Sequence, residues 1–137
     1  MNMKNVPEEK QRAYVEAQVI NNHLKQHAEQ LQKVDEKTGE ILTLLEALEG
    51  IGNDKGKMLA TIGGGVFLNA ELKETENVFV NVGANIIVKK KIPDVKKLLV
   101  QQVQELQHYK AQIHSQAEEL QEQLSILQVQ LQQQKAR

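Results

Sequence analysis

Two histidines near the start of the chain have a spacing that suits metal ligands. His23 and His27 are four residues apart, so on a helix they would lie on one face and could bind the same ion. The H-E-x-x-H motif, which would add a general base, does not occur in the sequence. We therefore favour a packing position for His27 and a solvated position for His23, and we predict no metal site.

The run Gly63 to Gly65 could in principle cradle a phosphate. It is followed by alternating, strand-like sequence rather than by a helix, and it lacks a Gly-Lys-Ser/Thr ending. A hairpin turn suits it better, because glycine readily adopts positive φ angles. The lysines Lys89 to Lys91 could also contact phosphate, but such a cluster on an edge strand more often prevents sheets from aggregating. We expect no catalytic residue and no cofactor.

The composition narrows the possible functions further. The chain has 137 residues, no Cys, 3% aromatic residues and a formal charge of −1. The absence of Cys excludes thiol chemistry and suits a reducing compartment, and a charge near zero gives no long-range attraction to nucleic acid or to a membrane surface. We find no apolar run of about 18 residues and no secretory signal. We expect a cytoplasmic protein that is not an enzyme.

The first long segment has the pattern of a coiled-coil helix. Pro7 and the acidic residues after it favour a helix start, Gly50 favours its end, and we predict a helix over residues 5–50. Seam residues recur in alternating steps of four and three. They are Ala13, Ala17, Ile20, Leu24, His27, Leu31, Val34, Thr38, Ile41, Leu45 and Leu48. The polar members His27 and Thr38 can fix the register at some cost in stability.

A second segment of the same kind follows the middle of the chain. Pro93 favours a start, and we predict a helix over residues 93–135 with Lys110 as an internal polar break in the seam. The seam residues are Leu99, Val103, Leu106, Lys110, Ile113, Ala117, Leu120, Leu124, Leu127, Leu131 and Gln134. The similar lengths favour an antiparallel pair within one chain over pairing between chains, so both chain ends meet at one distal tip.

Between the helices, residues 57–91 change from a helical to a strand-like period. The expected strands are 58–62, 66–73, 78–82 and 86–90. Turns at Gly63 to Gly65 and at Gly83 to Asn85 make two hairpins in tandem.

Four short strands cannot close a barrel alone, and a small isolated sheet is marginal in water. The seam of each helix is already occupied by its partner helix, so we expect the strands to pack with equivalent strands of other subunits. The expected oligomerisation residues are Val66, Leu68, Leu72, Val78, Val80, Val82, Ile86 and Val88.

Some apolar residues fall outside both seams. We expect the strands to cover those near the hairpins, which are Leu42, Leu44, Val95, Leu98 and Val100. At the distal tip, Tyr14, Val15 and Val19 are joined by Ile126 and Val129, and no part of the chain can cover them. Exposed apolar surface of this kind usually marks an interaction site. There are two alternatives: a helix of a neighbouring subunit covers these residues, or they are scattered aliphatic residues of a kind that protein surfaces commonly tolerate.

The order of helix, two hairpins and helix resembles the alpha-type subunit of prefoldin, a cytosolic chaperone of archaea and eukaryotes. The resemblance covers the whole chain, residues 1–137, as a single domain. It is carried by LLEALEGI at Leu44–Ile51, GGGVFLNAEL at Gly63–Leu72 and ENVFVNVGANIIVKK at Glu76–Lys90. Beta-type subunits have one hairpin, so two hairpins indicate the alpha type, and the short tails resemble archaeal members.

The resemblance implies a hexamer of two alpha and four beta subunits, in which the strands form an intersubunit β-barrel. It also implies ATP-independent capture of unfolded proteins by the coiled-coil tips and their transfer to a group II chaperonin. The implied client contacts are Tyr14, Val15, Val19, Leu124, Ile126, Leu127, Val129 and Leu131. The alternative is a structural coiled-coil protein, such as a filament-forming prefoldin-like subunit, and the residues leave open whether the partner is a beta subunit or another copy.

Overall fold

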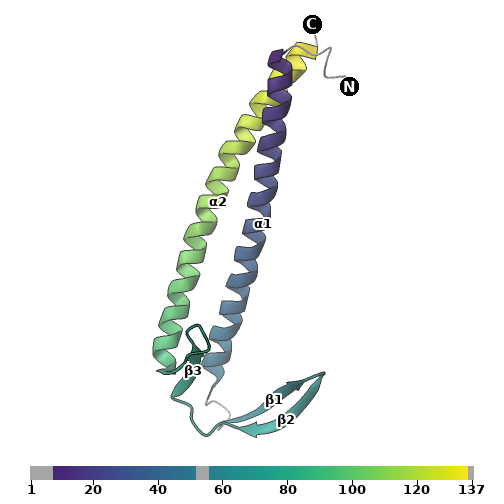
Figure 1. Cartoon of the computed structure of the whole chain (residues 1–137). Coiled ribbons are helices and arrows are strands. Elements are labelled where there is room, and N and C mark those ends of the chain that lie inside the picture. The colour runs from purple at the N-terminus through teal and green to yellow at the C-terminus, as the bar shows by residue number, and fades with distance from the viewer. Residues whose placement is uncertain (1–7, 52–55, 136–137) are drawn as a thin grey trace. The chain divides into compact units, whose positions relative to one another are not determined.

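The computed structural model describes residues 8–51 and 56–135. The element order confirms the predicted α+β fold of two long helices joined by two β-hairpins (Figure 1). The elements are α1 (Glu8–Gly50), β1 (Lys57–Gly63), β2 (Val66–Glu71), β3 (Asn77–Asn81), β4 (Ile87–Lys91) and α2 (Ile92–Lys135). The expected beginning of the first helix at residue 5 lies outside the described residues.

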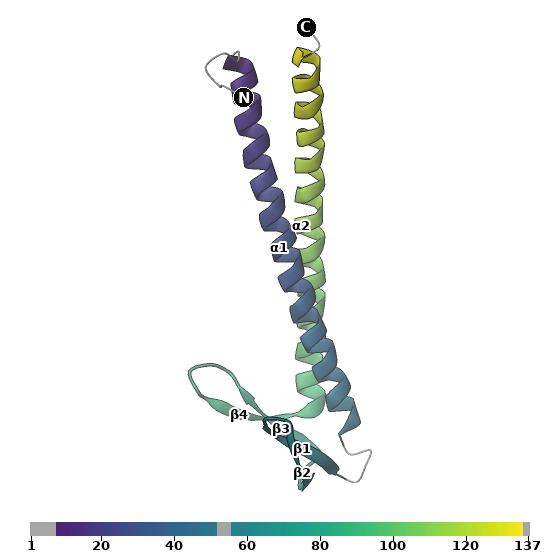
Figure 2. The ribbon, with the colours of Figure 1, turned by 90° about the vertical axis from the view of Figure 1, so that its right-hand side faces the viewer.

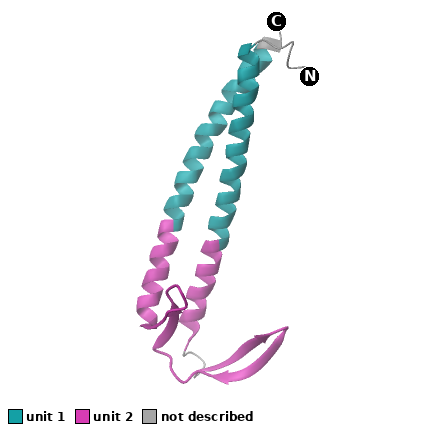
Figure 3. Cartoon of the chain, viewed as in Figure 1, with its two compact units in different colours: residues 1–36, 106–137 teal, residues 37–105 magenta. Residues whose placement is uncertain are grey.

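The chain divides into two compact units (Figure 3). The coiled-coil unit contains Met1–Glu36 and Leu106–Arg137, and the hairpin unit contains Lys37–Glu105. Both helices contribute to both units. Over residues 8–51 and 56–135, no helix is both long and apolar enough to cross a membrane.

In the coiled-coil unit, α1 and α2 pair in antiparallel fashion along the predicted seams. Ile20 packs with Leu124 and Leu127 in a buried cluster, and further along the pair Asp35 contacts Lys110. As residue numbers rise on α1 they fall on α2, which is the antiparallel arrangement. The four-three spacing is confirmed, because every seam residue with a described side chain is buried or half-buried.

Lys110, the predicted break in the seam, has a partner across the helix pair. Its Nζ donates a hydrogen bond to Asp35 Oδ1 at 2.7 Å. The Asp35 side chain is 56% exposed, and an exposed pair of this kind contributes about 0.2–1 kcal/mol to stability. The ion pair therefore adds only a little to the stability of the helix pair.

In the hairpin unit, the two hairpins form separate two-stranded antiparallel sheets, β1 with β2 and β3 with β4 (Figure 2). Thr61 pairs with Phe67, and a register shift between Thr61 and Gly63 leads into the turn. The φ angles of Gly63, Gly64 and Gly65 are 101°, 62° and 78°. These angles confirm the predicted turn and explain why it is built from glycine.

The second hairpin packs on the adjoining helix ends, whereas we expected the coiled coil to cover the strands poorly. Leu48, Ile92 and Val95 are buried there, with Ile51, Val78, Val80 and Leu99 packed against them; we call these seven residues the root cluster. The cause is the direct junction of β4 and α2. Because Lys91 ends β4 and Ile92 begins α2, β3 is held against the first turn of the helix, where Ile92 N donates to Glu76 O at 3.0 Å.

The strands cover less of this helix surface than predicted. We expected the strands to cover five off-seam residues of the helices, and only one of these, Val95, is buried. Leu42, Leu44, Leu98 and Val100 remain about half exposed. The short second hairpin reaches the side of α2 that carries Ile92, Val95 and Leu99, and the other four residues lie beyond it.

Gly39 offers a simple test of the α1 geometry. It lies inside the helix, and a Cβ added there would meet nothing within 4 Å. Because glycine in a helix interior costs about 0.8–1.0 kcal/mol relative to alanine, Gly39→Ala is expected to raise the free energy of unfolding by about that amount in a urea titration.

A matched glycine control is Gly56, which has a φ of +79° and where an added Cβ would lie 2.8 Å from Leu72 O. Gly56→Ala should therefore lower the free energy of unfolding. A Gly39→Ala protein no more stable than the parent would show that α1 is not a regular helix at this point.

Candidate functional site

The groups with possible chemistry are not brought together. No cluster of three or more potential metal ligands occurs among the residues that the structure describes. His23 is exposed, and His27 Nδ1 lies 3.3 Å from Gln30 Oε1 on the same helix. The run Gly63 to Gly65 forms a hairpin turn. The exposed apolar surfaces described next are the candidate functional features.

His27 supplies a second stability test. Its half-buried ring lies in the seam, where an aliphatic side chain would bury more apolar surface. His27→Leu is expected to raise the free energy of unfolding by about 1 kcal/mol, measured as a higher melting temperature of the isolated chain. His23→Leu, at an exposed position of the same helix, should change it little, and a marked fall for His27→Leu would mean that the imidazole makes a needed contact.

The distal end of the coiled-coil unit carries an exposed aliphatic surface. Val15, Val19, Ile126 and Val129 are 56%, 46%, 54% and 52% exposed; we call these four residues the tip patch. By the seam register, Val15 and Val129 occupy f positions, while Val19 and Ile126 occupy c positions. In an antiparallel pair the two c positions lie on the same side. The tip patch therefore extends over both helices and leaves the seam intact.

The other residues assigned to client contacts lie closer to the interhelical core. Leu124 and Leu127 are buried in the cluster with Ile20, so they join the two helices at the tip. Tyr14 and Leu131 are half-buried. They line a pocket of about 370 Å³ together with Gln128 and Gln132, which we call the tip pocket. Neither glutamine was predicted from the sequence, because a glutamine outside a seam is usually part of a solvated face.

The first hairpin exposes large apolar residues on both faces. Leu68 lies opposite Ala60, and Phe67 lies opposite Thr61 on the other face. Leu68 and Phe67 are 52% and 58% exposed. Exposed apolar residues on both faces of a two-stranded sheet leave it with much apolar surface in water. The hairpin is therefore a candidate for burial against another chain.

The residues predicted for oligomerisation fall into two groups. Val66, Leu68, Val82, Ile86 and Val88 are exposed, whereas Leu72, Val78 and Val80 are half-buried. Val78 and Val80 belong to the root cluster, where they pack on Leu48, Ile92 and Val95 of their own chain. The opposite face of the second hairpin carries Phe79 and Ile87, which are 68% and 64% exposed. That face is free for contact with a partner.

A salt bridge links the segment that connects the two hairpins to strand β4. Lys89 Nζ lies 3.2 Å from Glu74 Oε1, and the Asn77 side chain also donates to this carboxylate. The hydrogen bond from Asn77, followed by that from Lys89, lowers the pKa of Glu74. The resulting stabilisation is present above the unfolded-state pKa and is lost as the pH falls through the lowered pKa of the folded chain.

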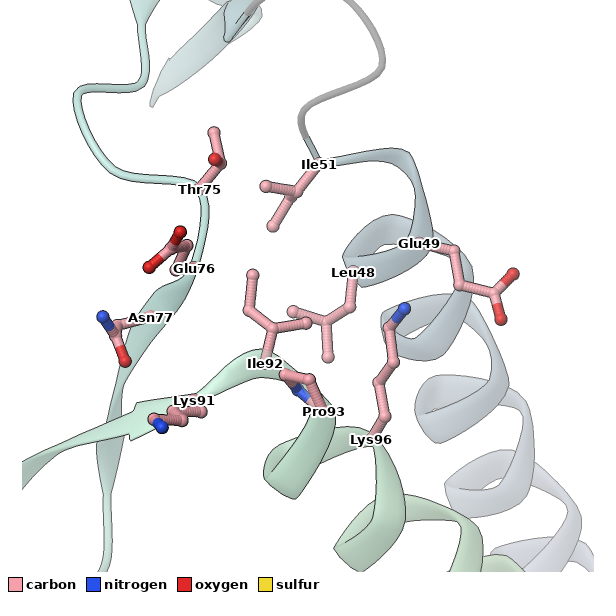
Figure 4. Close-up of a pocket in the computed structure, with 10 residues that line it drawn as sticks. All are labelled: Leu48, Glu49, Ile51, Thr75, Glu76, Asn77, Lys91, Ile92, Pro93 and Lys96. Carbon is pink, nitrogen blue, oxygen red and sulfur yellow. The ribbon is translucent and has the colours of Figure 1, made fainter.

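A pocket of about 440 Å³ opens beside the root cluster (Figure 4). Leu48, Ile51 and Ile92 point toward one another and form its apolar floor, while Glu49 points away. Lys91, Lys96 and Glu76 lie among its polar lining residues. The pocket is thus an uncovered part of the root cluster next to the second hairpin.

Comparison with known proteins places these features in a family. The model for the family Prefoldin subunit matches residues 17–137. Prefoldin subunit alpha from Methanococcus maripaludis is 28% identical over 109 residues, which cover 80% of this chain and 75% of that protein. Prefoldin subunit alpha from Methanosphaera stadtmanae is 35% identical over 83 residues, which cover 57% of this chain and 59% of that protein.

A solved structure shares the fold. The cryo-EM structure of filamentous PFD from Methanocaldococcus jannaschii matches with a TM-score of 0.74 and 14% identity, over 85% of this chain and 98% of that chain. The chain belongs to the prefoldin family of chaperone subunits, since the family model covers most of its length. The resemblance to alpha-type subunits is confirmed.

Proposed function

We propose that the chain is a subunit of an ATP-independent chaperone in the cytoplasm, which holds unfolded proteins with its coiled-coil tips and transfers them to a group II chaperonin. The exposed tip patch is the main observation that supports this proposal. Its four aliphatic side chains lie at c and f positions, outside the seam, and remain about half exposed to water. Contacts of this kind are weak singly, but several tips acting on one client raise the overall affinity without requiring a sequence motif.

The assembly part of the proposal rests on the hairpins. We propose that the exposed faces of both hairpins, including Leu68 and Phe79, pack with beta-type subunits in a barrel shared between chains. Burial of these faces would remove the apolar surface that two isolated hairpins leave in water. The complex would contain two alpha and four beta subunits, and its tips would act together on one client.

The experiment mixes the purified chain with an archaeal beta-type prefoldin subunit. Light scattering should give the mass of two alpha and four beta chains. The complex should suppress aggregation of a denatured client without ATP, and a group II chaperonin with ATP should then release folded client. A complex of the expected mass that leaves aggregation unchanged would overturn the chaperone proposal.

A structural role is the second candidate, because the chain shares its fold with a filamentous PFD. In that case the hairpins would join copies of this chain, and the tip patch would have no client. Light scattering and electron microscopy of the chain without beta subunits separate the two functions. The chaperone proposal expects small species, whereas the structural one expects long polymers that do not protect a client.

A further inference from the structure

The pocket beside the root cluster, which we call the root pocket, lies where the second hairpin meets the ends of both helices (Figure 4). Asn77 and Lys91, the residue pair of the β3–β4 ladder next to α2, both line it. Every lining residue belongs to the hairpin unit. A chain that packs along the second hairpin toward the helices therefore reaches the root pocket.

The floor of the root pocket is apolar. Leu48 and Ile92 are buried in the root cluster, and the half-buried Ile51 packs against them. The volume of about 440 Å³ lies in the lower part of the range of about 300–1,000 Å³ for ligand pockets. It suits one or two large apolar side chains that project from another chain, and their burial would cover the part of the root cluster that this chain leaves open.

A lysine ammonium lies beside this floor. Lys96 runs along Leu48 and ends beside the last turn of α1, whereas the carboxylates of Glu49 and Glu76 point away from the floor (Figure 4). Lys96 is half-buried and makes no hydrogen bond or ion pair within residues 8–51 and 56–135. The last turn of α1 has no basic residue of its own, so the single chain tolerates this charge at the negative end of the helix dipole. An apolar floor with an ammonium at its edge favours a ligand that carries an apolar group and a carboxylate close together.

We propose that the root pocket receives a large apolar side chain of a beta-type subunit, and that Lys96 pairs with an Asp or Glu carboxylate beside it in that subunit. This inference rests on the assembly part of the proposed function and deepens it, because it names a contact outside the shared barrel and the chemistry of the partner segment. The occupant is a subunit rather than a client because the root pocket adjoins the second hairpin, whose exposed face carries Phe79 and Ile87. Once both chains cover it, the ion pair with Lys96 offsets the lost hydration of the carboxylate.

The first test joins carboxylates directly to the lysines that they contact. A water-soluble carbodiimide activates a carboxylate, and a touching lysine then forms an amide with it while the reagent leaves as a urea, so no spacer remains. The complex of this chain with an archaeal beta-type subunit is treated, digested and mapped by mass spectrometry. Half of the copies of this chain carry an isotope label, which distinguishes a crosslink between two copies from one within a single chain.

Lys96 is expected to crosslink to an Asp or Glu of the beta-type subunit that has a large apolar residue beside it. Three results would overturn the proposal: a Lys96 crosslink confined to its own chain, a crosslink to a second copy of this chain, or a complex in which Lys96 forms none.

Charge reversal measures the contribution of the ion pair. Lys96→Glu should raise the concentration of beta-type subunit needed for half-assembly at least about tenfold, because the partner carboxylate would face a like charge. The increase should shrink at about 1 M salt, which screens the repulsion. The matched control is Lys97→Glu, at an exposed residue that does not line the root pocket, and it should change the concentration less than about twofold. Equal effects of the two reversals would contradict the ion pair.

A second pair of variants tests the apolar floor without touching it. Thr75 is an exposed lining residue in the connection between the hairpins, so the indole of Thr75→Trp can fill the root pocket. It should weaken assembly several-fold and leave the melting temperature of the isolated chain unchanged. Lys73→Trp, at an exposed residue of the same connection outside the root pocket, should assemble as the parent does. Equal assembly of both variants would show that no side chain of the partner enters the root pocket.

The two levels of the account fail in different ways. If the parent complex has the expected mass and protects a client, but Lys96 does not crosslink to the beta-type subunit, only the root-pocket proposal fails. If the parent chain forms no complex with the beta-type subunit, the proposed assembly fails and the root-pocket contact fails with it.

Discussion

Leu68→Asp is expected to abolish assembly with beta-type subunits while the chain itself stays folded. Leu68 is 52% exposed in the single chain, so a carboxylate there remains hydrated until a partner covers it. In the assembled barrel the charge would be buried without a partner, at a cost of about 3–5 kcal/mol. Light scattering of the mixture should show separate chains, and circular dichroism of the variant should retain the helical signal.

Two substitutions control this result. Asn69→Asp adds the same charge at the next, exposed residue of β2, where the parent side chain is already polar. It should weaken assembly far less. Val80→Asp places the charge against the root cluster of the same chain, so it should lower the melting temperature of the isolated chain as well as impair assembly. A Leu68→Asp chain that still gives the full mass would contradict assembly through the first hairpin.

Replacing all four tip-patch residues by Ser is expected to remove most client protection without affecting assembly. Each side chain is about half exposed and would lose about 1 kcal/mol of contact with a client. If several tips act on one client, as we propose, the losses combine, and at least about tenfold more complex should be needed to suppress aggregation by half. The measurement is light scattering of a denatured client titrated with parent or variant complex.

The control for the tip variant carries four Ser substitutions at exposed glutamines outside the tip patch. The positions are Gln26, Gln104, Gln107 and Gln116. The control thus carries as many substitutions as the tip variant, but it removes no aliphatic side chain. The control complex should protect the client as the parent does. Equal protection by the tip variant would show that clients bind elsewhere.

Features that depend on local sequence could be predicted, because their physical causes are local. The seams follow from the four-three spacing, which continues through His27 and Thr38 in α1 and through Lys110 in α2. The hairpin turn at Gly63 to Gly65 follows from the conformational freedom of glycine. The assembly involves other chains, so it was expected only from the resemblance to prefoldin and remains a proposal.

Features that depend on three-dimensional packing were missed or misplaced. Val78 and Val80 pack on their own chain because β4 runs directly into α2, and the alternation of β3 does not reveal which face is covered. Leu42 and Val100 were expected to be covered, but the second hairpin does not reach them. The sequence also did not indicate that Gln128 and Gln132 line a pocket with Tyr14 and Leu131, because that pocket depends on how the two helices pack.

We predict that the tips, and not the rest of the coiled coil, hold the client. The chain contains no Cys, so a single introduced cysteine can carry an environment-sensitive dye at a chosen position. Gln133→Cys places the dye one helical turn from Val129, and Gln107→Cys places it at an exposed residue elsewhere on α2. Addition of unfolded client to the assembled complex should shift the emission of the dye at residue 133 to shorter wavelength and leave the dye at residue 107 unchanged. A shift at residue 107 with none at residue 133 would contradict binding by the tips.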